Sequence, residues 1–188
     1  MRTLYLILFA TFLLMTSTSC KPEQTGSPVE TDWKEILQED LHLLGHRNWV
    51  LVVDKAFPEQ SSPGMKYLYV EQDLLPTLEE VLQALDGSTH VVPVIYQDKE
   101  LSFITEEQVK GIEQFRTRAA GILEGRGVQT LLHDEVFGML DESSSLFRVL
   151  VIKTNCTLPY TSVFMQLDCS YWGPEQEEIL REKMSAAP

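Results

Sequence analysis

The sequence predicts an α/β fold with three layers, α/β/α, built on a mixed, mostly parallel central sheet. Two observations lead to this fold class. Short apolar runs rich in β-branched residues alternate along the chain with segments whose apolar residues recur at helical spacing. The clearest run, residues 49–53, is apolar at every position, which is typical of a strand covered on both faces. Such alternation predicts a sheet with helices packed on both sides.

Each predicted element begins or ends where the sequence changes character. The first helix begins at the capping-box pattern Asp32-Trp33-Lys34-Glu35 and stops at Gly45. The longest helix begins at a second such box, Thr105-Glu106-Glu107-Gln108, and ends against Gly125-Arg126-Gly127. Pro93 favours an edge position or a bulge for the strand that contains it. The other elements are expected as strands over 49–53, 90–96, 128–132, 148–153 and 161–168, and as helices over 78–85, from 134, and over 175–184.

The first nineteen residues have the character of an export signal. Arg2 precedes an uncharged apolar run that is shorter than the about 20 residues a membrane-spanning helix needs. Small residues then lead directly into Cys20, which resembles a lipobox, where Gram-negative export machinery attaches diacylglycerol to the thiol and cleaves before it. Ser17 stands where many lipoboxes have leucine, and an ordinary signal peptide before an unmodified cysteine is the alternative. We expect a lipid-anchored protein of the cell envelope, in the outer membrane, facing the periplasm or the surface.

The chain divides into three parts: a signal over 1–19, a lipidated cysteine with a tether over 20–30, and one domain over 31–188. The tether is polar and contains Pro22 and Pro28, so it cannot bury enough surface to become ordered. The remaining chain is long enough for a single core and too short for two comfortable domains.

The strongly acidic composition restricts the partners of the protein. The formal net charge is −13 and becomes −14 when Arg2, the one charged residue of the signal, is removed. Such a surface repels phosphates, and no basic cluster compensates locally, so nucleic acid is not an expected partner. Electrostatic docking on anionic lipid is disfavoured for the same reason, which leaves the acyl chains to hold the protein at the membrane.

The sequence carries none of the common motifs for nucleotide, serine-hydrolase or zinc-protease chemistry, and we expect no cofactor. Cys156 and Cys169 lack the spacing of a zinc or redox motif. A disulfide between them in an oxidising periplasm and a pair of buried free thiols are both open. His42 and His46 are four residues apart, but Gly45 ends the helix that would align them, so no metal site is expected.

Four stretches carry motifs that occur together, in this order, in a known family. The first has a Leu-Gly-His turn, an apolar strand and Asp-x-(Gly/Ala)-x-Pro, with an eight-residue step from His46 to Asp54. The other three stretches are Leu75-Pro76-Thr77 with Val81-Leu82, Leu132-His133-Asp134-Glu135-Val136-Phe137, and Val151-Ile152-Lys153-Thr154 through Pro159-Tyr160. Together they resemble the D-ribose pyranase / L-fucose mutarotase family, and the resemblance spans nearly all of residues 31–172.

The resemblance implies a cofactor-independent isomerase that interconverts anomers or ring forms of a free pentose or deoxyhexose. It also implies a ring-shaped homo-oligomer. Exchange of anomers requires a group that takes and gives protons near neutral pH, and His46 is the expected catalytic residue. His46 follows a helix C-terminus, where the helix dipole stabilises an imidazolium. The residues expected to bind the sugar are Asp54, His133, Tyr160, Thr161 and Ser162.

The eight-residue step from His46 to Asp54 also has a geometric consequence. Eight residues of extended chain span about 26 Å, so a straight strand places the two side chains at opposite ends. Either the chain bends sharply, or His46 of one subunit meets Asp54 of another. We favour sites shared between subunits.

Two departures from the family pattern keep other functions open. Ser162 stands where the family commonly has asparagine, and Asn155-Cys156 replaces Gly-Glu. These changes favour, as an alternative, a non-catalytic sugar-binding lipoprotein on the same fold. A metal-binding module that uses several of the four histidines is a second alternative, although their spacings match no known ligand set.

Overall fold

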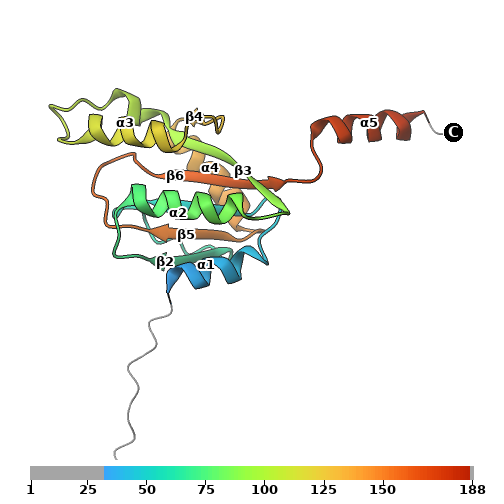
Figure 1. Ribbon diagram of the computed structural model, residues 1–188, viewed down its shortest axis with the longest axis horizontal. Coiled ribbons are helices and arrows are strands. Elements are labelled where there is room, and N and C mark those ends of the chain that lie inside the picture. The colour runs from blue at the N-terminus through green and yellow to red at the C-terminus, as the bar shows by residue number, and fades with distance from the viewer. Residues whose placement is uncertain (1–31, 187–188) are drawn as a thin grey trace, which may run out of the picture. The chain divides into compact units, whose positions relative to one another are not determined.

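The computed structural model of the protein describes residues 32–186, so the predicted signal, the anchor at Cys20 and the tether lie outside the described residues. One mixed sheet contains six strands in the order β2-β5-β1-β6-β3-β4 (Figure 1). Strand β6 runs antiparallel to both of its neighbours, and the other three pairings are parallel. The predicted mixed, mostly parallel sheet is therefore confirmed. The strands are β1 (Trp49–Val53), β2 (Met65–Tyr69), β3 (Val91–Asp98), β4 (Gln129–Leu131), β5 (Val149–Lys153) and β6 (Val163–Cys169).

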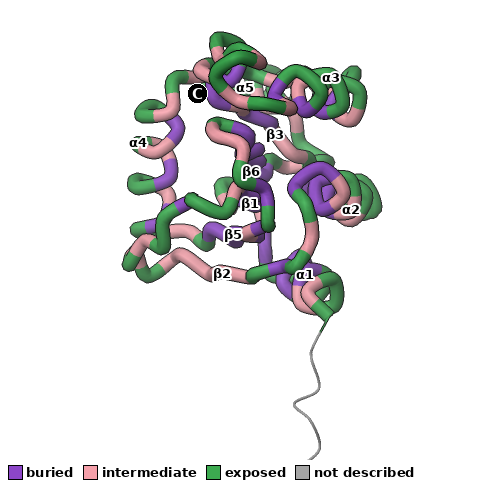
Figure 2. The backbone as a smooth tube through the Cα atoms, turned by 90° about the vertical axis from the view of Figure 1, so that its left-hand side faces the viewer, coloured by how far each residue is buried: buried purple, intermediate pink, exposed green. Residues whose placement is uncertain are grey.

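Helices cover both faces of this sheet, which confirms the predicted α/β/α layers. Helices α1, α2 and α3 pack on one face and α4 on the other (Figure 2). Helix α5 follows β6 and has no buried residue. Within residues 32–186, no helix has the length and apolar character needed to cross a bilayer. The helices are α1 (Trp33–Leu41), α2 (Leu74–Asp86), α3 (Ile112–Ile122), α4 (His133–Ser144), α5 (Pro174–Ser185) and the short 3-10 helix η1 (Lys99–Phe103).

Strand β1 lies at the centre of both cores. Val50 and Val52 face the core under α1 and α2, whereas Trp49, Leu51 and Val53 face the core under α4, and all five are fully buried. Because successive side chains of a strand point to opposite faces, a run of five apolar residues is what a doubly covered strand requires. Because β1 is buried on both faces, its backbone holds the residues at its two ends in fixed positions.

Strand β2 was not predicted from the sequence. It is an edge strand that pairs only with β5, and its residues are half-buried or exposed, so it lacks an apolar run. Lys66 in this strand donates to the carboxylate of Asp40 on α1 at 2.7 Å. A charged residue on a short edge strand also discourages pairing with other chains. Pro93 of β3 lies where that strand pairs with β6 alone, because β4 covers only Tyr96 to Asp98, in agreement with its expected edge position.

The prediction that the longest helix begins at Thr105 is wrong. The capping contacts do form, since the Thr105 N–H donates to Gln108 Oε1 at 2.9 Å, but they close only a turn. Gly111 then adopts a left-handed φ of 88°, which interrupts a right-handed helix. The Glu106 carboxylate accepts from the N–H groups of Gly111 and Glu113, so α3 begins at Ile112.

Candidate functional site

The carboxyl end of β1 carries Asp54, and the start of β6 holds it in place. The Ser162 hydroxyl donates to Asp54 Oδ2 at 3.0 Å and accepts from the Asp54 N–H at 3.2 Å. Asp54 Oδ1 accepts from the N–H of Ala56 at 2.8 Å. The carboxylate is thus oriented from two sides, at the edge where open α/β sheets place ligand-binding groups.

A histidine and a buried aspartate form a pair on the same edge. Asp98 is the last residue of β3, and His133 is the first residue of α4, directly after β4. His133 Nδ1 lies 3.0 Å from Asp98 Oδ2. The Asp98 side chain is 1% exposed and that of His133 is 37% exposed. With Nδ1 bonded to the carboxylate, Nε2 is the ring nitrogen available to a ligand.

Glu100 fixes the backbone of that histidine. Both of its carboxylate oxygens lie 3.1 Å from the N–H of His133, at the N-terminus of α4. A carboxylate there satisfies a free helix N–H and interacts favourably with the helix dipole. Glu100 belongs to η1, which the sequence did not predict, so its proximity to His133 was not foreseen. Asp98 could have been picked out from the sequence as a candidate site residue, because it lies at the end of strand β3 just as Asp54 lies directly after strand β1.

Aromatic side chains surround the exposed part of the histidine. The ring of Tyr160 meets that of His133 edge-on, with centroids 5.2 Å apart, and Phe137 lies 4.5 Å away. Phe57 packs against Phe137 at 5.3 Å. Tyr160 has a left-handed φ of 57°, which is uncommon for a residue other than glycine. Backbone conformations of this kind are found more often at functional sites than elsewhere. The fold thus brings Asp54, His133 and Tyr160 to one edge of the sheet.

The electrostatics of this edge centre on Asp98. Burial raises the pKa of the Asp98 carboxyl, His133 opposes that rise, and the charges of Glu100 and Asp54 add to it. Its Oδ1 has no hydrogen-bond partner among residues 32–186. A buried carboxylate with one unsatisfied oxygen destabilises the folded state. Destabilising buried charges of this kind are typical of functional sites.

Asp98→Asn should therefore stabilise the protein at neutral pH. The raised pKa means that the folded state binds the Asp98 proton more tightly than the unfolded state does. Wild-type stability is then fully present below the usual pKa of 3.8 and falls as the pH rises through the higher folded-state value. Asparagine does not titrate. The free energy of unfolding of the Asp98→Asn variant should therefore exceed that of the wild type at pH 7, and the difference should vanish below pH 3.8. Urea unfolding at several pH values measures this, and a variant less stable at pH 7 would contradict it.

Thr161 and Ser162, both expected to contact a sugar, are buried. The Thr161 hydroxyl donates to the carbonyl of Leu158 at 2.8 Å and lies 3.6 Å from the Cys156 sulfur. The Ser162 hydroxyl is committed to Asp54. The Ser162 hydroxyl therefore holds Asp54, and the Thr161 hydroxyl holds the loop from Leu158 to Thr161.

His46 lies at the opposite end of β1 from Asp54. It precedes the strand, and its Nδ1 is 3.5 Å from Asp168 Oδ1 near the end of β6. The antiparallel register of the two strands is continuous from Trp49↔Gln166 to Val52↔Val163. The chain therefore does not bring His46 and Asp54 together within one copy.

The two cysteines and His90 have surroundings that suit structural roles. Cys156 and Cys169 are free thiols, so the possible disulfide is not formed; Cys156 is buried and Cys169 is partly exposed. His90 Nε2 lies 3.1 and 3.0 Å from the carbonyl oxygens of Leu41 and Leu44. Within the described part of the chain, no three His, Cys, Asp or Glu side chains are grouped to hold a metal ion.

Comparison with known proteins supports the fold. No family model and no curated protein matches the sequence. The structure is similar to RbsD from Bacillus subtilis complexed with D-ribose, with TM-score 0.51 and 17% identity over 71% of this chain and 91% of that one. FucU from Bifidobacterium longum has TM-score 0.47 and 13% identity over 71% and 94% of the two chains.

A third structure is the fucose mutarotase from Streptococcus pneumoniae in complex with L-fucose. It has TM-score 0.47 and 14% identity over 69% of this chain and 89% of that one. At these identities the likeness concerns the fold alone. The chain shares its six-stranded mixed α/β fold with RbsD of Bacillus subtilis.

Proposed function

We propose that the protein is a cofactor-independent monosaccharide isomerase of the pyranase or mutarotase type. The observation that carries the proposal is the His133–Asp98 pair, placed beside Asp54 and Tyr160 on one edge of the sheet. The fold shared with RbsD, which was solved with D-ribose, supports a sugar as the ligand. The implied substrate is a free pentose or deoxyhexose.

His133 is the proposed general base of this reaction. Hydrogen bonding of Nδ1 to Asp98 leaves a lone pair on Nε2, which accepts the proton of the anomeric hydroxyl. The bond between C1 and the ring oxygen breaks, and the ring oxygen takes up a proton, which gives the open-chain aldehyde. Closure onto the other face of the carbonyl, or by another hydroxyl, gives the other anomer or ring size. Asp98 stabilises the imidazolium that forms during the transfer.

Asp54 and Tyr160 are the proposed sugar-binding groups. Asp54 retains unused lone pairs on oxygens that Ser162 and Ala56 hold in place, so it can accept from sugar hydroxyls. Tyr160 presents its ring and hydroxyl beside His133. Ser162 and Thr161 act through these two residues as positioning groups.

We further propose that His46 joins this edge from a neighbouring copy. The five residues of β1, at about 3.3 Å each, lie between His46 and Asp54, and the two side chains contact opposite ends of β6, so one copy cannot supply both to one monosaccharide. In a homo-oligomer with shared sites, His46 of a neighbouring copy donates the proton that the ring oxygen takes up.

A non-catalytic sugar-binding protein is the second candidate, and the commitment of the Ser162 hydroxyl to Asp54 favours it. Saturation-transfer NMR with D-ribose and L-fucose distinguishes the two functions. The isomerase transfers magnetisation between the resonances of different anomers or ring forms faster than buffer does. Saturation transfer from protein to sugar without faster exchange would identify a binding protein instead.

The lipid anchor remains part of the proposal. We predict that full-length protein expressed in a Gram-negative host is recovered with membranes and carries lipid on Cys20, because small residues lead directly into that cysteine. Cys20→Ser should release the protein from membranes or leave it unprocessed, and Cys169→Ser is the matched control. Mass spectrometry of the mature N-terminus decides, and an unmodified residue other than Cys20 at that end would contradict the anchor.

A further inference from the structure

A cavity lies at the other end of β1, away from His133. Its volume is about 580 Å³, within the range of small-molecule sites. The turn before β1 supplies His46 to its lining and the end of β6 supplies Asp168. The segment leading into α5 supplies Tyr171 and Trp172, and α5 itself supplies Glu177. The catalytic edge proposed above uses none of the last three residues.

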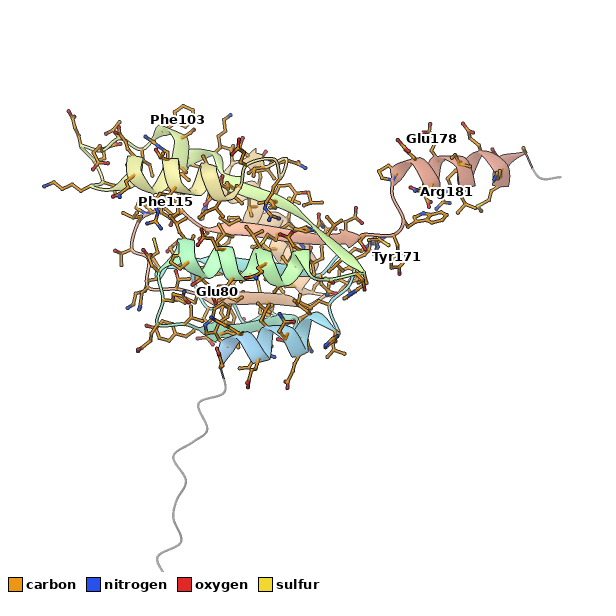
Figure 3. All side chains as sticks on the ribbon, viewed as in Figure 1. Glu80, Phe103, Phe115, Tyr171, Glu178 and Arg181 are labelled. Carbon is orange, nitrogen blue, oxygen red and sulfur yellow. The ribbon has the colours of Figure 1, made fainter. Side chains whose placement is uncertain are left out.

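Two adjacent aromatic side chains are unusually exposed at this cavity. Tyr171 is 74% exposed and Trp172 is 44% exposed, whereas Trp49 is fully buried. Tyr171 lies where β6 gives way to α5, and Arg181 lies on the helix that follows (Figure 3). Exposed aromatic rings gathered at a cavity mark a binding site more often than single exposed apolar residues do.

The indole of Trp172 is held in a fixed orientation. Its Nε1–H donates to Glu177 Oε2 at 2.8 Å, and Arg181 Nε donates to Glu177 Oε1 at 2.6 Å. These two bonds lower the pKa of the Glu177 carboxyl. The polar edge of the ring is thereby satisfied by the protein, so a ligand meets the flat apolar face. A preorganised platform of this kind loses little side-chain entropy on binding.

The polar groups at the cavity suit the hydroxyls of a neutral ligand. The charge of Glu177 is balanced by Arg181, and Asp168 Oδ1 accepts from the N–H of Cys169 at 2.8 Å and lies 3.5 Å from His46 Nδ1. A cationic ligand binds best to an aromatic cage with unbalanced negative charge. A polyol instead uses the remaining carboxylate lone pairs for its hydroxyls and an aromatic face for its C–H groups.

We propose that Tyr171 and Trp172 form a stacking platform for a saccharide beside His46. The inference rests on the proposed function in taking a sugar as the ligand. Within one copy the platform lies at the opposite end of β1 from Asp54, and in the proposed oligomer it would lie beside the site that His46 shares with a neighbouring copy. A site of this kind would also accept a sugar whose anomeric oxygen is blocked, since stacking needs no free anomeric hydroxyl.

Methyl glycosides test the platform without being substrates, because they cannot open their rings. The probes are the methyl glycosides of ribose, fucose, glucose, galactose and mannose, titrated to high millimolar concentration against ¹⁵N-labelled protein. The chain has three tryptophans, and loss of one indole N–H signal in Trp172→Phe assigns the signal of interest. We expect at least one glycoside to shift the Trp172 signal and leave that of Trp49 in place.

Trp172→Ala should weaken that glycoside's binding about tenfold, equivalent to roughly one stacked ring, as followed by ligand-detected saturation transfer. Tyr171→Ala should weaken it as well. Phe103→Ala is the matched control, since Phe103 is exposed on η1 far along the chain from the cavity and should leave binding unchanged.

Three results would overturn the proposed platform. The first is that no glycoside shifts the Trp172 signal, and the second is that tetramethylammonium shifts it while the glycosides do not. The third is that Trp172→Ala converts an oligomer to a smaller species, which would assign the rings to a contact between copies. Glycoside binding without anomer exchange would instead support the platform and contradict the proposed isomerase activity. Anomer exchange without glycoside binding would support the isomerase activity and contradict the platform.

Discussion

Replacing His133 by glutamine should slow sugar anomer exchange by about 10²- to 10⁴-fold at neutral pH, the usual contribution of a general base. Glutamine can keep a polar contact to Asp98, but it has no lone pair that titrates near neutrality. His133 is the first residue of α4 and is partly exposed, so the substitution should leave the fold intact. Magnetisation exchange between the anomers of D-ribose and of L-fucose measures the rate.

His42→Gln is the matched control for this experiment, because His42 is an exposed histidine at the end of α1. It should exchange sugar at the wild-type rate. A His133→Gln protein that also retains this rate would show that the His133–Asp98 pair is structural. Asp98→Asn adds a separate readout: it should lower the exchange rate while raising stability at pH 7, which loss of folding cannot mimic.

Mixed assemblies should recover activity that neither parent variant has. His46→Ala and Asp54→Asn should each abolish exchange, and Asp54→Asn can retain the turn contact to Ala56. If each site takes His46 from one copy and Asp54 from another, random co-assembly gives both wild-type residues in about a quarter of the sites. Refolding the two variants together should therefore restore about a quarter of the wild-type rate.

The control is a mixture of the variants assembled separately and combined without refolding, which should remain inactive if subunits do not exchange. Size-exclusion chromatography with light scattering establishes that the co-refolded species is an oligomer. A monomeric wild-type protein that exchanges sugar, or an inactive co-assembled mixture, would contradict the shared site. His46 would then have no part in the reaction at the His133 edge.

The elements that the sequence predicted well are those whose burial leaves a local pattern. Residues 49–53 are apolar throughout because β1 is covered on both faces. The separation of His46 from Asp54 was also predictable, since a strand has a nearly constant rise per residue. Strand β2 was not predictable in this way, because its stability comes from pairing with β5, about eighty residues further along the chain.

The partners of the site residues were harder to foresee than the residues themselves. His133 was expected at the site, but Asp98 and Glu100 reach it through the pairing of β3 with β4 and through η1. The place of Asp98 at the end of a strand marks it as a candidate, but the sequence gives no local indication that Asp98 or Glu100 contacts His133. The burial of Thr161 was missed for a similar reason, because its hydroxyl bonds to Leu158 inside the same loop. The sequence also did not single out Tyr171 and Trp172, whose rings the structure places at the surface.

The most direct test of the central claim is the rate of anomer exchange of D-ribose and L-fucose with purified wild-type protein. The measurement compares exchange with wild-type protein, with His133→Gln, with His42→Gln and with buffer alone. The account predicts faster exchange of at least one sugar with wild type and His42→Gln, and a buffer-like rate with His133→Gln. Exchange of both sugars at the buffer rate with wild-type protein that saturation transfer shows to bind them would contradict it.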